Sequence, residues 1–418
     1  MSSWTERAKA VLPGGGFGNF DASLVIERGE GSRVWGADGN EYLDYLIGSG
    51  PMLLGHSHPE VVDAVAEQLS QGFSFFASNP RGIELAEVIC DAVPCAEQLR
   101  YVSTGGEADM FAIRLARAFT DRSLIVKFEG AYHGMSDEGQ MSLSPSKLID
   151  FPQPEPDSAG ILQAVQDQTL VIPWNSPEHL RAVFDQHGAH IAAIIAEPLQ
   201  RIIPAQAGFL QSLRDFCDQH ESLLIFDEVV TGFRFAWGGA QSLYGVVPDL
   251  CTLGKTIGGG MPLAAIAGRR DVMSLFDKSV AGDQWLMQVG TLSGNPIAAV
   301  AGLKTLEILK RPGQFERLRG LGDRIQAMLQ NVLSAQGIPH QIVGNPMLFD
   351  VMFSDQPISD YRDLARADKT LQSAFNASLR KSGILKSPAK VYPHLALTED
   401  DLALTQAAIE RAARVLGQ

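Results

Sequence analysis

The middle of the chain alternates between short hydrophobic runs and segments whose apolar residues recur at helical spacing. The apolar runs predict strands that end at Val102, within 124–134, within 189–200, at Phe226 and at Leu253. Helical spacing predicts helices that begin at Pro59, cover 82–94, follow Gly106 and cover 209–220. This succession of strands and helices between about 60 and 295 predicts a doubly wound α/β domain with a mostly parallel sheet.

The two ends of the chain carry a different pattern. Residues 1–60 hold short apolar stretches separated by Gly-Glu-Gly and Asp-Gly turns, which predict short strands. The tail, 301–418, predicts helices at 314–333 and 399–416 and apolar strands near 341–353. Because 418 residues exceed the usual size of one hydrophobic core, more than one domain is expected. We expect a large α/β domain over 61–300 and a smaller α+β domain built from 1–60 and 301–418.

Composition narrows the class of protein. The 34 basic and 48 acidic residues give a net charge of −14, which argues against nucleic acid or an anionic membrane as the main partner. The four cysteines form no CxxC pair and no metal-ligand spacing, so we expect reduced thiols and no metal site. No run has the length of a membrane span, and the first residues do not form a signal peptide. These features predict a soluble cytoplasmic protein.

The most informative stretch runs from 223 to 268. Its first strand, Leu223–Phe226, leads directly into Asp227 and Glu228, and a second apolar run leads to Lys255 and three glycines. Parallel strands joined by a crossover bring their carboxyl ends to the same sheet edge, where open α/β sheets bind ligands. A lysine amine and a carboxylate at that edge suit pyridoxal phosphate, whose aldehyde forms a Schiff base with lysine and whose ring nitrogen pairs with an acid.

Other interpretations of Lys255 are open on this stretch alone. The sequence Gly254-Lys255-Thr256 resembles the end of a phosphate-binding P-loop, but Asp249 stands where that motif needs a glycine. Lys255 could also be a surface lysine, with Asp227 as a helix cap. A separate phosphate cradle favours the cofactor, because Ser103, Thr104, Gly105 and Gly106 form a turn at the start of a predicted helix. Tyr132, at the end of the strand in 124–134, is placed to stack on a flat ring.

Taken together, these stretches resemble the class III, fold type I pyridoxal-phosphate-dependent aminotransferases, and most of all the glutamate-1-semialdehyde 2,1-aminomutase-like subgroup. The matching segments, in order, are GPMLLGHSHP, STGGEADMFAIRLARAFT, KFEGAYHG, LLIFDEVVTGFR, PDLCTLGKTIGGGMP and GTLSGNP. They extend from about residue 34 to 300.

The resemblance implies a set of roles. Lys255 would be the Schiff-base lysine and the base that moves the substrate proton, and Asp227 would pair with the pyridinium nitrogen. Thr291 would reach the phosphate in the neighbouring subunit, which implies a homodimer with shared sites. The other implied cofactor contacts are Ser103, Gly105 and Gly106 at the phosphate, Tyr132, His133 and Val229 around the ring, and Glu197 beside the phenolic oxygen.

The departures from the aminomutase pattern are equally informative. Gly106 replaces the usual cradle threonine, and Ser49 replaces the tryptophan of the GSWGP turn. The stretch 14–23 lacks the substrate-binding arginine, 387–394 lacks the family's glutamate, and 136–160 replaces the glycine-rich gating loop. Because a mutase must retain its intermediate behind such a gate, the sequence favours an ordinary transaminase that works in ping-pong order.

The amino donor is predicted less closely. It is an amino acid, with β- or ω-amino acids among the candidates, or an amine, and a keto acid accepts the amino group. Candidate substrate contacts are Ser49, Arg28, Arg33, Arg201 and Arg234, the arginines because a guanidinium can grip a carboxylate through two hydrogen bonds. The alternatives are an aminomutase-like isomerase, a decarboxylase of the same fold, and a cofactor-binding protein without catalysis.

Overall fold

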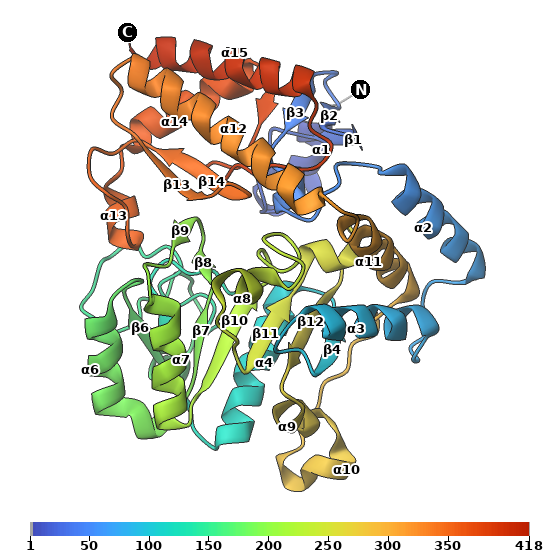
Figure 1. The fold of residues 1–418 in the computed structure, drawn as a ribbon, viewed down its shortest axis with the longest axis vertical. Helices are drawn as coiled ribbons and strands as arrows, with labels where there is room; N and C mark the ends of the chain where they lie inside the picture. Colours follow the sequence, from blue (N-terminus) through green and yellow to red (C-terminus); the bar gives the residue numbers. More distant parts are fainter. Residues whose placement is uncertain (1–2, 418) are drawn as a thin grey trace.

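A seven-stranded sheet occupies the centre of the larger half of the molecule (Figure 1). The computed structural model describes residues 3–417. In spatial order the strands are β4 (Gln98–Val102), β12 (Ala264–Gly268), β11 (Leu250–Leu253), β10 (Leu223–Glu228), β7 (Ile191–Ala196), β5 (Leu124–Phe128) and β6 (Thr169–Ile172). Every neighbouring pair is parallel except the two that involve β12.

Helices cover both faces of this sheet, as the unbroken apolar strands require. On β10, Ile225 packs with the cluster that contains helix α4 (Gly105–Thr120), whereas Leu224 and Phe226 pack on the opposite face with α7 (Phe209–His220). Successive strand residues point to opposite faces, so one hydrophobic run serves two layers. The predicted doubly wound α/β domain is confirmed.

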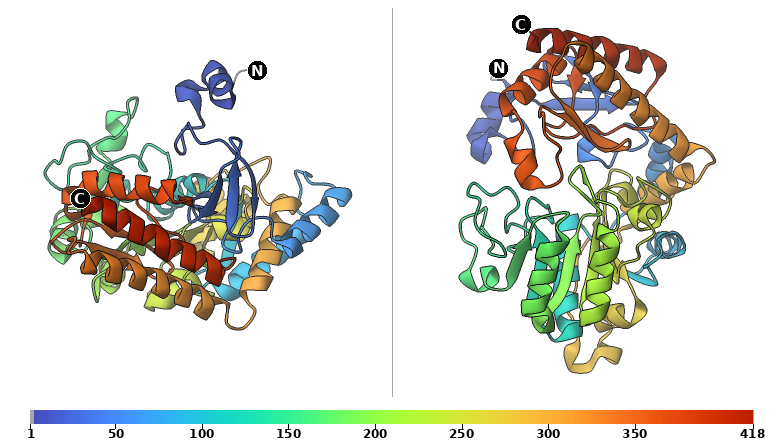
Figure 2. Two further views of the ribbon diagram at one scale, coloured as in Figure 1. Left: turned by 90° about the horizontal axis from the view of Figure 1, so that it is seen from above. Right: turned by 60° about the vertical axis from the view of Figure 1, so that its left-hand side comes forward.

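The N-terminal and C-terminal segments lie together in the smaller half (Figure 2). Its sheet combines β1 (Ile26–Glu30), β2 (Arg33–Gly36) and β3 (Glu41–Asp44) with the C-terminal strand β15 (Ile384–Leu385), which pairs with β3 in parallel. Beside it lie the hairpin β13 (Gln341–Asn345) and β14 (Leu348–Met352) and the helices α12 (Gln314–Ala335), α14 (Lys369–Lys381) and α15 (Glu399–Leu416). The exact boundaries at residues 60 and 300 stay a prediction.

The remaining helices and strands connect or extend these two halves. They are α1 (Trp4–Val11), α2 (Pro59–Gln71), α3 (Pro80–Ala92), α5 (Gln163–Gln166), α6 (Pro177–His187), α8 (Gly239–Tyr244), α9 (Arg270–Met273), α10 (Lys278–Ala281), α11 (Pro296–Leu309), α13 (Tyr361–Arg366) and the short pair β8 (Leu199–Gln200) and β9 (Ile203–Pro204). Within residues 3–417, none of the helices is both long and apolar enough to cross a bilayer.

Candidate active site

Asp227 lies near the carboxyl end of strand β10, and Lys255 follows the neighbouring strand β11. Strands β10 and β11 are parallel, and Asp227 lies opposite Thr252 in their register. Lys255 comes two residues after the end of β11 and begins a short 3-10 turn that ends at Gly258. The structure therefore brings the two residues to the carboxyl end of adjacent strands, where α/β sheets bind ligands.

The Asp227 carboxylate is buried and held by hydrogen bonds on both oxygens. Its Oδ1 accepts from the Val229 amide at 3.0 Å, and its Oδ2 lies 2.8 Å from His133 Nδ1. The second imidazole nitrogen of His133 is buried and has no hydrogen-bond partner among the described residues. These contacts fix the direction of the Asp227 carboxylate at the sheet edge.

The Lys255 amine has no hydrogen-bond or ion-pair partner within residues 3–417. Its backbone adopts the left-handed conformation, with φ 48°, which costs about 1–2 kcal/mol for a residue with a Cβ. A Cβ built on Gly50 would lie 3.2 Å from Lys255 Cδ and 3.3 Å from Tyr392 Cε1, so the lysine runs alongside Gly50 and Tyr392. Burial lowers the pKa of Lys255, against the opposing effect of negative charge on Asp227 and Glu197.

Tyr132, Glu197 and Arg201 form a second group at this edge. The Tyr132 amide donates to Glu197 Oε2 at 3.0 Å, which ties the loop after β5 to the end of β7. The Arg201 guanidinium carbon lies 5.3 Å from the centre of the Tyr132 ring. Arg201 sits in the turn between β8 and β9 with φ 60°, and no carboxylate pairs with it in the described part of the chain. A cation is thus held beside the tyrosine without a counter-ion.

The glycine turn before α4 offers free backbone amides. Thr104 caps the helix by accepting from the Glu107 amide, and the Glu107 carboxylate accepts from the amides of Ser103 and Thr104. The amides of Gly105 and Gly106 have no acceptor among residues 3–417. A Cβ on Gly105 would lie 2.8 Å from Val229 Cγ1, so glycine is required for this close approach. Two amides at a helix N-terminus suit an anion such as phosphate.

Gly134 supports the same turn, and its replacement provides a first test. A Cβ on Gly134 would lie 2.3 Å from Gly106 Cα, and its φ is +76°. We expect Gly134→Ala to lower the free energy of unfolding by about 3 kcal/mol, the sum of left-handed strain and steric overlap. Gly160→Ala is the control, because φ there is +91° but no atom lies within 4 Å of the new Cβ. Denaturant unfolding that gives equal losses for both variants would contradict the close contact with Gly106.

Comparison with known proteins places this site in a family. Residues 18–413 match the profile described as Aminotransferase class-III. The chain belongs to the class III aminotransferases. It is 42% identical over 401 residues to the glutamate-1-semialdehyde 2,1-aminomutase of Thermomicrobium roseum, covering 94% of this chain and 91% of that protein.

Two solved structures match this class III chain over nearly its whole length. An omega-transaminase from Sphaerobacter thermophilus superimposes with a TM-score of 0.94 at 34% identity, covering 98% of this chain and 96% of the other. A beta-phenylalanine aminotransferase from Variovorax paradoxus gives 0.85 at 34% identity, covering 97% and 91%. The fold type I architecture expected from the sequence is therefore confirmed.

Pyridoxal phosphate is the cofactor of this class III enzyme. The site fits it on observations of its own within residues 3–417: a desolvated Lys255 amine without a partner, a fixed buried carboxylate at Asp227, and the Gly105 and Gly106 amides without acceptors. Tyr132 is 37% exposed, so its ring remains accessible beside the Arg201 guanidinium.

Several residues that the sequence suggested for the substrate lie elsewhere or are already engaged. Arg234 has no exposed surface and donates to the backbone carbonyls of Gly50, Met347 and Pro393, so we leave it out of the proposed substrate site. Arg33 pairs with Glu41 and with Asp401 on α15. Arg28 stacks on Trp35, with its guanidinium carbon 3.6 Å from the ring centre. Ser49 is exposed beside Gly50, and Thr291 is exposed on the surface segment before α11.

Two charged residues near the site were missed by the sequence reasoning. Asp109 lies on the buried face of α4, and its carboxyl oxygen is 2.6 Å from Thr252 Oγ1. Helical spacing could have found it, since residue 109 shares a face with the apolar residues at 112, 113 and 116. Lys390 lies two residues before Tyr392, and the charges of Arg201, Glu197 and Asp227 all act on its pKa. Its segment, 387–394, stood out in the sequence only because the family's glutamate is absent there. No local sequence pattern distinguishes Lys390 from a surface lysine.

Proposed function

We propose that this protein is a transaminase, which takes the amino group from an amino acid or amine and passes it to a keto acid. The observation that carries the proposal is that two groups lie at the same edge of the sheet. These are the Lys255 amine, which has no partner within residues 3–417, and the Asp227 carboxylate, which is fixed by hydrogen bonds. The sequence identity to an omega-transaminase and a beta-phenylalanine aminotransferase, 34% in each case, supports it.

Each side chain then has a task. Pyridoxal phosphate supplies an aldehyde that exchanges amines and a ring that withdraws electrons from the reacting carbon. With the cofactor bound, Lys255 would provide the amine at that aldehyde and would move the proton, for which its lowered pKa suits it. Asp227 would hold a proton on the ring nitrogen, and His133 and Val229 hold Asp227. Ser103, Gly105 and Gly106 would hold the phosphate, Tyr132 would stack on the ring, and Glu197 fixes the Tyr132 loop.

We also propose that the substrate carries a carboxylate, which binds between Arg201 and Lys390. Neither cation has a carboxylate partner within residues 3–417, and both lie near the Tyr132–Glu197 group. Burial and the positive charge of Arg201 together lower the pKa of Lys390 to about 7. A bound carboxylate would relieve this repulsion.

This subsite predicts selective effects on donors. Arg201→Ala should raise KM for carboxylate-bearing donors about 10- to 100-fold, because a hydrogen bond between charged groups is lost. Donors without a carboxylate, such as simple amines, should keep their KM within about threefold. Arg181→Ala, at an exposed position on α6, is the matched control. Steady-state kinetics on both donor types measure this, and an equal rise of KM for both would remove Arg201 from the subsite.

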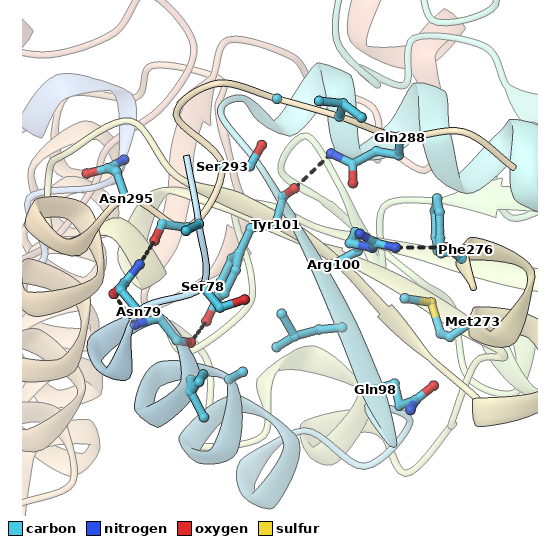
Figure 3. A pocket seen from close by; sticks show the side chains of 18 of the residues that line it. Ser78, Asn79, Gln98, Arg100, Tyr101, Met273, Phe276, Gln288, Ser293 and Asn295 are labelled. Carbon is cyan, nitrogen blue, oxygen red and sulfur yellow. Dashed lines mark hydrogen bonds between the residues drawn. The ribbon is translucent and has the colours of Figure 1, made fainter. Parts of the chain in front are cut away.

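A homodimer completes the proposal. A groove of about 1150 Å³ runs between α3, β4 and the segments 273–280 and 288–296 (Figure 3). Its wall is fixed by hydrogen bonds from Gln288 to Tyr101 and from Asn79 to Gly294. Exposed apolar side chains line it: Phe75, Phe76, Ile83, Val280 and Val289.

Thr291 lies in the same groove, and apolar surface of this kind marks an interface. We propose that a second copy covers the groove and receives Thr291 at its phosphate site. Sedimentation of the purified protein tests this, and a monomer at working concentrations would contradict it.

The four unpaired cysteines support a cytoplasmic location.

An aminomutase-like isomerase is the second candidate, because the Thermomicrobium roseum relative bears that name. The two functions separate on glutamate 1-semialdehyde supplied alone. An isomerase converts it completely without an acceptor, whereas a transaminase stops after about one turnover per site. For the transaminase, varying donor and keto acceptor together should give the parallel double-reciprocal lines of ping-pong kinetics.

A further inference from the structure

Asp109 is an acid on the buried side of helix α4. It is only 2% exposed and lies in a row with Ala108, Ala112 and Ile113, which are also buried. Acids are rarely buried to this degree unless a cation or several hydrogen bonds compensate. No cation within the described residues forms an ion pair with Asp109. Its side chain is hydrogen-bonded to the Thr252 hydroxyl on β11, with 2.6 Å between Asp109 Oδ1 and Thr252 Oγ1.

That hydroxyl links Asp109 to Asp227. Thr252 Oγ1 lies 3.5 Å from Asp227 Oδ1 and 2.6 Å from Asp109 Oδ1, so one hydroxyl stands between two buried carboxyl groups. One polar atom each of Asp109, Asp227 and His133 lie within 4.8 Å of one another. The threonine has a single proton, and it can donate that proton to only one of the two acids.

The charges around Asp109 decide which acid keeps a proton. Burial raises the pKa of Asp109 well above its ordinary value, and the negative charge of Asp227 raises it further. Glu197 also raises the pKa of Asp109, while the hydrogen bond from Thr252 and the positive charge of Lys255 lower it. His133 faces Asp227 instead, through its Nδ1. Two carboxylates this close and this buried do not both ionise.

We propose that Asp109 is a positioning residue that stays protonated at neutral pH and, through Thr252, directs a hydroxyl proton onto Asp227. The Asp109 carboxyl donates to Thr252 Oγ1, and the Thr252 hydroxyl then donates to Asp227 Oδ1. Together with the Val229 amide and His133, this hydroxyl fixes the direction of the Asp227 carboxylate. The inference rests on the proposed role of Asp227 toward the cofactor ring nitrogen.

Infrared spectroscopy of the cofactor-loaded protein tests the protonation state directly. At pH 7.5 (roughly neutral), the spectrum of wild type minus that of Asp109→Asn should show the carbonyl-stretch band of a buried carboxylic acid. The difference is needed because burial also raises the pKa of Glu228 and Asp350, and any band from these two acids is common to both proteins. Asp185→Asn, at an exposed position on α6, is the control, and its difference from wild type should lack the band. A wild-type minus Asp109→Asn spectrum without this band would overturn the proposal.

Cofactor affinity tests the hydroxyl relay. An asparagine amide also donates to Thr252, so Asp109→Asn should keep the dissociation constant of pyridoxal phosphate within about threefold. Asp109→Leu and Thr252→Val should weaken binding about tenfold or more, because Asp227 loses a hydrogen bond. Unfolding of the cofactor-free variants checks that each is folded. If Asp109→Leu does not fold, Thr252→Val alone tests the relay. Equal weakening in Asp109→Asn and Thr252→Val would overturn the relay. Neither measurement requires turnover, so a failed transaminase assay and a failed relay remain distinguishable.

Discussion

Lys255→Ala is expected to lower kcat/KM by about four orders of magnitude while the protein still binds pyridoxal phosphate. The Lys255 amine lies beyond the carboxyl end of β11 and has no hydrogen-bond or ion-pair partner within residues 3–417. Burial lowers its pKa toward the range in which it can act as a base. The remaining contacts, at Asp227, Tyr132 and the two cradle amides, do not involve the lysine and should hold the cofactor. Equilibrium dialysis and absorption of the bound cofactor measure retention, and steady-state kinetics measure the loss.

Lys381→Ala is the matched control for this variant. Lys381 lies at the exposed end of α14 in the smaller half, so its loss should leave kcat/KM within about twofold. Turnover close to wild type in Lys255→Ala would contradict the assignment of the lysine, whatever the control shows.

Asp227→Asn is expected to lower kcat/KM by about a thousandfold. An amide has nearly the same shape but no charge, so it cannot hold a proton on the ring nitrogen of the cofactor. The variant keeps a hydrogen-bond acceptor for Val229, so the local backbone should stay in place. Steady-state kinetics measure the loss, and the thermal unfolding midpoint of the cofactor-free protein checks the fold.

Asp185→Asn again provides a control, since that side chain is exposed on α6 and is expected to change neither activity nor stability. If Asp227→Asn retained activity within about threefold of wild type, the role of the buried carboxylate would have to be abandoned.

Much of the fold could be predicted from the sequence because the central strands are buried on both faces. The run 223–226 contains no polar residue and the run 250–253 contains only Thr252, and their observed strands, β10 and β11, match them closely. Strand β12 was not anticipated as an antiparallel member, because Ala264–Gly268 is built of small residues with weak strand preference. Helix α14 was also missed, because only Phe375 and Leu379 of its residues are buried.

Site residues could be predicted from the sequence where they lie at the end of a buried strand. They could not be predicted where segments far apart in the chain bring them together. Lys255 and Asp227 are marked by the strands that precede them. The contact of Arg234 with the carbonyl of Gly50 joins positions far apart in the chain, so sequence alone left it as a substrate candidate. Lys390 reaches the site only through tertiary packing, whereas the helical spacing of 109 with 112, 113 and 116 places Asp109 on the buried face of α4.

One measurement tests the central claim most directly: a single turnover of the purified, cofactor-loaded protein with one amino donor at a time and no acceptor. A panel of α-, β- and ω-amino acids and amines would be followed by the absorption of the bound cofactor and by analysis of products. We expect at least one carboxylate-bearing donor to convert the cofactor to its amine form and to release one keto product per site. An isomerised product, with the cofactor returned to its starting form, would contradict transamination and establish the aminomutase instead.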